Sequence, residues 1–244
     1  MLFCTLKMGI AAVIFDLDNT LIWTKQSDAN AFVQVARFVQ KETPSCNAEE
    51  IVSTFRKLLQ SAEKDPENKI PIDEWRTQLW KTALNSNQNE EFAARVYQLW
   101  KKLRLEGLYF DEEVRAQLKR LRLRYKLLLL TNGDSQVQRE KVAQIGAEDF
   151  FDEIVISGDH PEPKPHPSIF KTSCKLLGVE ASQCVMVGDS QETDIQGGAN
   201  ARVLATVWIN PHGKQPSSDY VKADYTIKSV LEIDSILQQL HPPS

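Results

Sequence analysis

The stretch VIFDLDNT, residues 13–20, places the carboxylates of Asp16 and Asp18 two residues apart at the end of an apolar run. Val13 to Phe15 are typical of a buried parallel strand, because such strands are covered on both faces. Ligands of open α/β sheets bind in the crevice at the carboxyl ends of the strands, which is where Asp16 falls. Acidic residues at strand ends also form simple turns, so this stretch alone does not distinguish a site from a turn.

Three further segments carry polar residues at strand exits or in adjoining loops. Residues 127–133 (LLLLTNG) form an apolar run that ends in Thr131, Asn132 and Gly133, and residues 185–194 (VMVGDSQETD) form another that ends in Asp189 and Asp194. Lys164 lies in the proline-rich segment 161–167 (PEPKPHP). Taken singly, Thr131 also fits a helix N-cap, Asp189 a turn residue and Lys164 a solvated loop charge. Together with Asp16 and Asp18, they predict one phosphate-transfer site.

The four segments resemble the motifs of the haloacid dehalogenase superfamily, whose members mostly move phosphoryl groups through an aspartyl-phosphate. The resemblance extends from about Ala11 to Ile209. Residues 127–141, 184–198 and 205–210 also resemble the family of phosphatases that release phosphate from N-acylneuraminate 9-phosphate in sialic acid biosynthesis. The implied partner is therefore a small phosphorylated sugar acid. The implied fold is an α/β, Rossmann-like parallel-sheet core with helices on both faces and an inserted all-helical cap.

The distribution of apolar residues predicts where that insertion lies. Residues 1–23 form the first part of the α/β core, 24–110 the helical cap, and 111–244 the remainder of the core. The last segment alternates strand and helix patterns, as parallel sheets do. Turn signals at 43–45, 65–68 and 85–89 divide the cap into roughly four helices. Trp75, Trp80 and Trp100 have helical spacing there, which suits the core of a small bundle or, alternatively, contact with substrate.

Bulk composition excludes several classes of function. The 244 residues, 42% hydrophobic and 25% charged, suffice for an α/β core plus an insertion. A net charge of −4 gives no indication of nucleic-acid or anionic-membrane binding. No apolar run reaches the roughly 20 residues of a membrane span. Lys7 interrupts the apolar N-terminus, and the four cysteines lack the spacing of metal ligands or of a disulfide framework, so we expect a cytoplasmic protein. The oligomeric state is not indicated.

The two carboxylates of the first segment suit a two-step phosphoryl transfer. Asp16 is predicted to be the nucleophile that attacks phosphorus in line with the leaving oxygen. Asp18 is predicted to protonate that oxygen and then to accept a proton from the water that opens the aspartyl-phosphate. Such an acid/base is what hydrolysis of an ester to an alcohol requires. By resemblance, dehalogenases lack a carboxylate here, whereas sugar phosphomutases retain it and stay an alternative.

Several carboxylates and a phosphate dianion need positive charge to share one site. Like charges about 4 Å apart repel by about 4 kcal/mol at an effective dielectric of about 20. Mg²⁺ and Lys164 would supply that charge. The resemblance implies that the Asp16 side chain, the Asp18 main-chain carbonyl and Asp189 are the metal ligands. Asp194 has three alternatives: it supports Mg²⁺, directly or through water, pairs with Lys164, or caps a helix.

The remaining candidates concern binding. Thr131, Asn132 and Gly133 lie at a strand-to-helix junction, where phosphate groups bind readily, and Lys164 would also contact the phosphate. Arg139 could bind a substrate carboxylate, or it could lie on a solvated helix face with Glu140 and Lys141. A sugar-phosphate phosphatase of other specificity, a phosphomutase and a non-catalytic scaffold are alternative functions. The intact set of motif residues disfavours the scaffold.

Overall fold

The computed structural model of the chain describes residues 9–62, 70–85 and 90–240. These residues form two compact units: an α/β unit, which takes in the chain up to Trp23 and again from Phe110, and a helical unit, Thr24–Tyr109. The N-terminal segment up to Lys7, the predicted turn at 65–68 and most of that at 85–89 lie outside the described residues. Within the described part, no helix is long and apolar enough to cross a membrane.

The α/β unit contains one parallel sheet, which confirms the predicted fold class. Its described strands follow the spatial order β3-β2-β1-β4-β5-β6. The central strand β1 is fully buried and pairs in parallel with β2 and β4, so that Phe15 lies beside Leu129 and Val187. Strand order reverses between β1 and β4, which is where ligands of such sheets bind. The strand bounds are Ala12–Phe15, Lys126–Thr131, Glu153–Ile156, Cys184–Gly188, Ala205–Ile209 and Tyr225–Ile227 for β1 to β6.

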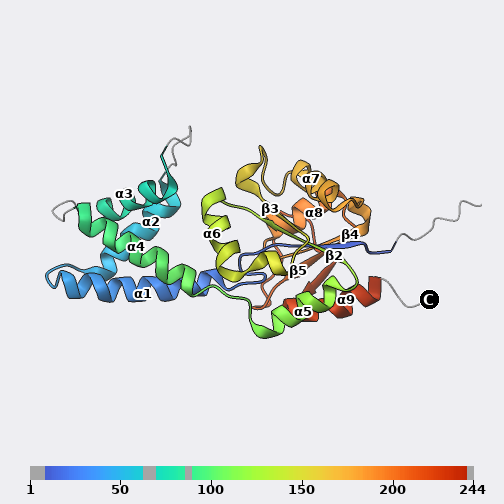
Figure 1. Cartoon of the computed structure of the whole chain (residues 1–244), viewed down its shortest axis with the longest axis horizontal. Helices are drawn as coiled ribbons and strands as arrows, with labels where there is room; N and C mark the ends of the chain where they lie inside the picture. The colour runs from blue at the N-terminus through green and yellow to red at the C-terminus, as the bar shows by residue number, and fades with distance from the viewer. Residues whose placement is uncertain (1–8, 63–69, 86–89, 241–244) are drawn as a thin grey trace, which may run out of the picture. The chain divides into compact units, whose positions relative to one another are not determined.

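Helices cover both faces of the sheet, with α5 and α9 on one face and α7 and α8 on the other (Figure 1). Helix α7 starts at Pro167, after His166 at the N-cap, and ends before Gly178 in the left-handed conformation (φ 65°). The buried thiols of Cys174 and Cys184 lie in the core between α7 and the sheet. The helix bounds are Glu112–Arg122 (α5), Ser135–Ile145 (α6), Pro167–Leu177 (α7), Gln196–Ala201 (α8) and Ile233–Leu240 (α9).

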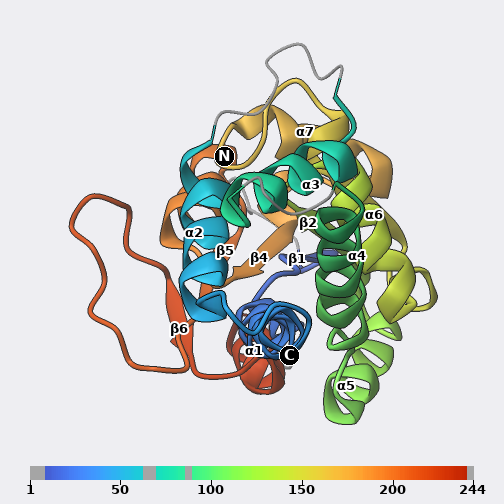
Figure 2. The same ribbon diagram turned by 90° about the vertical axis from the view of Figure 1, so that its left-hand side faces the viewer.

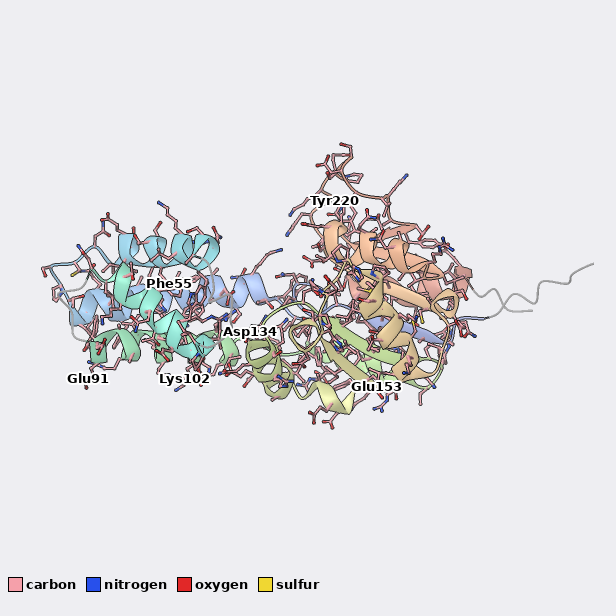
Figure 3. All side chains as sticks on the ribbon, turned by 90° about the horizontal axis from the view of Figure 1, so that it is seen from above. Phe55, Glu91, Lys102, Asp134, Glu153 and Tyr220 are labelled. Carbon is pink, nitrogen blue, oxygen red and sulfur yellow. The ribbon has the colours of Figure 1, made fainter. Side chains whose placement is uncertain are left out.

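A long connection without helix or strand joins β5 to β6. Residues 210–224 extend away from the sheet as a loop (Figure 2), and Tyr220 projects with it (Figure 3). This segment includes 211–220, whose proline and serine content favours irregular structure. Strand β6, which follows the loop, is only three residues long and partly exposed at its start.

The helical unit has its own aromatic core. The side chains of Phe55, Trp80 and Trp100 are fully buried, and the Phe55 and Trp80 rings stack with their centroids 3.8 Å apart. Phe55 lies among the helices (Figure 3). Trp80 and Trp100 therefore belong to the bundle core, and Trp75 packs against it partly buried. The described helices are α1 Thr24–Glu42, α2 Ala48–Ser61, α3 Ile72–Ala83 and α4 Glu90–Glu106.

Candidate active site

The site forms where the carboxyl ends of β1, β2 and β4 meet. Asp16 follows β1, Thr131 is the last residue of β2, and Asp189 follows β4. The Asp16 N–H donates to the Val187 carbonyl at 2.9 Å, so the β1–β4 pairing continues through this residue. The chain then turns sharply, with Asn19 at a positive φ of 62° and its N–H donating to the Ile22 carbonyl. Asparagine tolerates this conformation better than most residues, which suits it to the turn.

Lys164 connects two buried carboxylates. Its Nζ donates to Asp16 Oδ1 at 2.8 Å, to Asp194 Oδ1 at 2.7 Å and to the Leu130 carbonyl at 2.7 Å. The lysine is only 2% exposed, and Asp194 is fully buried. All three protons of the ammonium group therefore have acceptors, which is what a buried lysine requires. Of the three alternatives for Asp194, the structure shows the pair with Lys164.

Gly188 leaves the space that Asp194 occupies. A Cβ atom at position 188 would lie 2.2 Å from Asp194 Oδ2, far inside van der Waals contact. Asp194 Oδ2 also accepts the Ser190 N–H at 3.0 Å, at the start of the π-helical turn Gln191–Ile195 that precedes α8. The glycine and this turn together fix the Asp194 carboxylate against Lys164.

Burial dominates the ionisation of this cluster. Loss of hydration raises the pKa of Asp16 to about 7, although Lys164 opposes the shift and Asp194 and Asp18 reinforce it. Burial also raises the pKa of Asp194, again against the effect of Lys164. For Lys164, burial alone would lower the pKa, but the two carboxylates more than compensate and raise it above its usual value. The cluster carries more carboxyl groups than its single ammonium neutralises.

The carboxylates form a group that fits a hard divalent cation. Asp16, Asp189 and Asp194 each offer one oxygen, and these three oxygens lie within 4.8 Å of one another. Mg²⁺ prefers carboxylate oxygens supplemented by water and substrate phosphate. The three carboxyl groups outnumber the single ammonium group of Lys164, and a bound cation would offset that excess of negative charge. The donor set therefore fits Mg²⁺, with Asp194 in the group. A role for the Asp18 carbonyl stays a prediction.

The predicted phosphate-binding residues lie at the end of β2. Thr131 is fully buried, and its Oγ1 accepts a hydrogen bond from the Gln138 amide at 2.5 Å. The Asn132 side chain donates to the Lys164 carbonyl at 2.9 Å and accepts the Lys164 N–H at 3.1 Å, so it fixes the lysine loop. Gly133 has a φ of 143°, a conformation that side chains disfavour, and its N–H donates to Ser157 Oγ. The structure brings this segment to Lys164; its binding of phosphate stays a prediction.

Two residues of α6 contact the predicted acid/base, and sequence reasoning missed both. Lys141 Nζ binds both carboxylate oxygens of Asp18, at 2.7 and 2.8 Å, and Gln138 Nε2 donates to Asp18 Oδ2 at 2.9 Å. Both side chains lie in the buried stripe of the helix with Val137, Val142 and Ile145. That shared periodicity was the available signal, because Gln138 and Lys141 are three residues apart. Lys141 is only 5% exposed.

Arg139 lies in a different environment. Its Nη2 binds Asp159 Oδ2 at 2.7 Å, and the arginine side chain is 60% exposed. Asp159 also accepts a hydrogen bond from Ser135 Oγ, which is the largest cause that lowers the pKa of Asp159, and Arg139 adds to it. This exposed pair supports the surface interpretation of Arg139 over a contact with substrate.

Comparison with known proteins places this geometry in a family. The haloacid dehalogenase-like hydrolase model matches residues 10–202. The chain is 40% identical to N-acylneuraminate-9-phosphatase of Rattus norvegicus over 235 residues, or 95% of each chain, and equally similar to that of Homo sapiens. A HAD phosphatase from Thermococcus onnurineus has a similar structure, with a TM-score of 0.65 and 26% identity over 93% of this chain and 98% of that chain.

These similarities extend beyond the sheet to nearly the whole chain, and the relatives in question are named as phosphatases. The segment around Asp16, the loop that carries Lys164 and the Gly188-Asp189 strand exit all fall within the matched range. The chain therefore belongs to the haloacid dehalogenase-like hydrolases, and within them it is a phosphoric monoester hydrolase.

Proposed function

We propose that this protein is a Mg²⁺-dependent phosphatase that hydrolyses N-acylneuraminate 9-phosphate to N-acylneuraminate and phosphate, and that it acts in the cytoplasm. The observation that carries the chemistry is the buried cluster in which one ammonium group, that of Lys164, binds Asp16 and Asp194. The substrate rests on the 40% identity, over 95% of the chain, to phosphatases named for it.

In the first step, Asp16 Oδ attacks phosphorus and the bond from phosphorus to the sugar oxygen breaks. The products are an aspartyl-phosphate on Asp16 and an alkoxide, which takes a proton from Asp18. Asp16 must be ionised to attack. Its pKa of about 7 in the metal-free protein, set by burial and opposed by Lys164, makes the ionised form accessible near neutral pH. Further positive charge at the site would favour that form.

In the second step, water attacks phosphorus and the acyl-phosphate bond breaks, which regenerates the Asp16 carboxylate. Asp18 accepts the proton that the water loses. The same side chain thus gives a proton in one step and takes one in the next, and it is restored at the end. Release of inorganic phosphate completes the cycle.

The other residues stabilise charge on the transferring group. Lys164 lies between Asp16 and Asp194, where its ammonium group can compensate the phosphoryl oxygens as well as the carboxylates. Thr131 and Gly133 lie at the adjoining strand exit and would contact the phosphate. Mg²⁺, held by Asp16, Asp189 and Asp194, would neutralise charge on the phosphoryl oxygens when bound.

The helical unit would serve as the cap that selects the leaving group. The proposed cap spans residues 24–110, close to the compact unit Thr24–Tyr109. Because its large aromatic side chains are buried in its own core, the residues that contact substrate would come from its surface. A small phosphorylated sugar acid is the class of substrate that this proposal requires.

The test is phosphate release from N-acetylneuraminate 9-phosphate, compared with a panel of sugar, nucleotide and aryl phosphates, with Mg²⁺ and with EDTA. We expect a metal-dependent preference for the sialic acid phosphate. Turnover of other esters alone would retain the chemistry and reject the substrate. Isomerised sugar phosphate without phosphate release would indicate a mutase instead. The Asp16→Asn variant should lose nearly all turnover while keeping its fold, and substantial activity of that variant would reject Asp16 as the nucleophile.

A further inference from the structure

Two polar side chains interrupt the buried face of α6. Gln138 is 1% exposed and Lys141 is 5% exposed, on the same helical stripe as Val137, Val142 and Ile145. Burying an amide or an ammonium group is costly unless each has partners. Their partners therefore define what these two residues do.

Both side chains bind the carboxylate of Asp18. Lys141 Nζ lies 2.7 Å from Oδ1 and 2.8 Å from Oδ2, and Gln138 Nε2 lies 2.9 Å from Oδ2. Each carboxylate oxygen thus has at least one donor from α6. Rotation of the Asp18 side chain away from this position would break all three contacts at once, so α6 fixes its orientation.

Gln138 also connects Asp18 to the end of β2. Its Nε2 group also lies 2.5 Å from Thr131 Oγ1 and 2.8 Å from the Asn132 carbonyl, so its two protons are shared among three acceptors, whereas its Oε1 has no hydrogen-bond partner among the described residues. The same amide therefore contacts the predicted acid/base and the predicted phosphate-binding segment. Movement of one relative to the other would be resisted by this shared donor.

The arrangement is unlike a contact made for stability alone. A buried ion pair generally gains little over well-packed apolar residues, so packing of α6 does not require one here. The Lys141 side chain is 7% exposed, whereas that of Asp18 is 25% exposed. Lys141 is thus more deeply buried than the carboxylate it binds, and Asp18 stays partly accessible.

We propose that Lys141 and Gln138 are positioning residues that hold the Asp18 carboxyl group in the orientation from which its acid form gives a proton to the leaving oxygen. The inference rests on the proposed function, in which Asp18 is the acid/base. It assigns to α6 a part in the chemistry that the motif residues alone do not account for. Lys141 itself does not touch the reacting atoms; it acts through Asp18.

The expected effect follows from what a general acid contributes. Such a group accelerates a reaction by about 10² to 10⁴-fold, and a displacement of about 1 Å costs on the order of 10²-fold. Lys141→Met should therefore lower kcat/KM for an alkyl phosphate by about 10- to 100-fold. It should change kcat/KM for 4-nitrophenyl phosphate by less than about 3-fold, since that phenolate departs without a proton.

The kcat/KM values isolate departure of the leaving group. For each ester, kcat/KM includes only the steps up to that departure, so later hydrolysis of the aspartyl-phosphate does not affect it. Lys141→Arg keeps the charge and can bind both oxygens, so it should recover a large part of the alkyl-phosphate activity. Arg122→Met is the matched control, because it removes the cation of a surface pair with Asp152 in the same unit. Arg122→Met should leave kcat/KM unchanged for the alkyl phosphate and for 4-nitrophenyl phosphate.

Equal losses on both esters, or no loss on either, would overturn the inference. If Lys141→Met does not fold, Gln138→Leu provides the same comparison, with a smaller selective loss expected on the alkyl ester. Failure of the proposed function is distinguishable: the wild-type protein would then hydrolyse neither ester, or Asp16→Asn would retain turnover. Wild-type activity that Asp16→Asn abolishes, combined with an unselective Lys141→Met, rejects this inference alone.

Discussion

Removal of the Lys164 ammonium should destabilise the α/β unit, and the cost should depend on pH. Lys164 is almost fully buried and donates to Asp16, Asp194 and the Leu130 carbonyl. Lys164→Met keeps the side chain long and apolar but leaves two buried carboxylates without their counterion. Breaking a buried ion pair in this way costs about 3 to 5 kcal/mol. We therefore expect a loss of about 4 kcal/mol in the free energy of unfolding at pH 8, in EDTA.

The sign of the pH dependence comes from the carboxyl groups. The pKa of Lys164 is raised, so its stabilising contribution is fully present throughout pH 5 to 8. Burial raises the pKa of Asp16 to about 7, so the folded state holds a proton that the unfolded state has lost above its ordinary pKa of 3.8. Stability from this group is thus present at low pH and lost as pH rises through 7. Lys164 lowers the pKa of Asp16. Without this lysine, the pKa of Asp16 would rise further, and the stability lost at high pH would be larger.

At pH 5 the Asp16 carboxyl is mostly protonated, so the variant leaves one buried negative charge fewer without a counterion and the cost should be smaller than at pH 8. Urea unfolding in EDTA at both pH values measures the difference, with hydrogen exchange of β1 identifying the transition of the α/β unit. Arg122→Met is the control: its pair with Asp152 has side chains 41% and 33% exposed and should cost about 0 to 1 kcal/mol. A cost for Lys164→Met below about 1 kcal/mol at pH 8, or one equal at both pH values, would refute the reasoning.

Three further changes test other parts of the structure. Gly188→Ala places a Cβ 2.2 Å from Asp194 Oδ2, so it should displace Asp194 from Lys164 and lower phosphate release at least about 10-fold, with circular dichroism unchanged. Asp16→Asn removes a buried carboxylate whose pKa is about 7, so in EDTA it should raise Tm at pH 8 and change it little at pH 5. Phe55→Ala should cost about 3 to 5 kcal/mol in the helical unit, measured by denaturation, without shifting hydrogen exchange in β1.

Much of the α/β unit was predictable because its strands are apolar on both faces. The runs Leu127–Leu130 and Cys184–Val187 lie within β2 and β4, and the polar residues that follow them fall at one edge of the sheet. Backbone position at a strand exit follows from the parallel pattern alone. Strand β6 was not predicted, since three residues at a partly exposed sheet edge carry no apolar run.

Side-chain partners were harder to predict than backbone positions. Asp194 had three alternatives in sequence; the structure shows its pair with Lys164, which the missing Cβ of Gly188 permits, and also places it beside Asp16 and Asp189. Lys141 was given no role from the sequence, since charged side chains rarely lie inside. Its burial depends on the Asp18 carboxylate, which is 123 residues away in the chain. No local pattern contains that contact.

The structure separates two carboxylates that are adjacent in the same turn. Asp16 binds Lys164, which comes from the loop before α7, whereas Asp18 binds Lys141 of α6. A nucleophile and an acid/base need different environments, because one must stay free to attack while the other exchanges a proton. If one cation bound both groups, the ionisation of Asp16 would depend on that of Asp18, which would oppose the separation of the nucleophile from the acid/base. Two lysines from different segments allow each carboxylate to be compensated separately. Lys141→Met should therefore impair proton transfer by Asp18, and Lys164→Met the charge balance around Asp16, within the same first step.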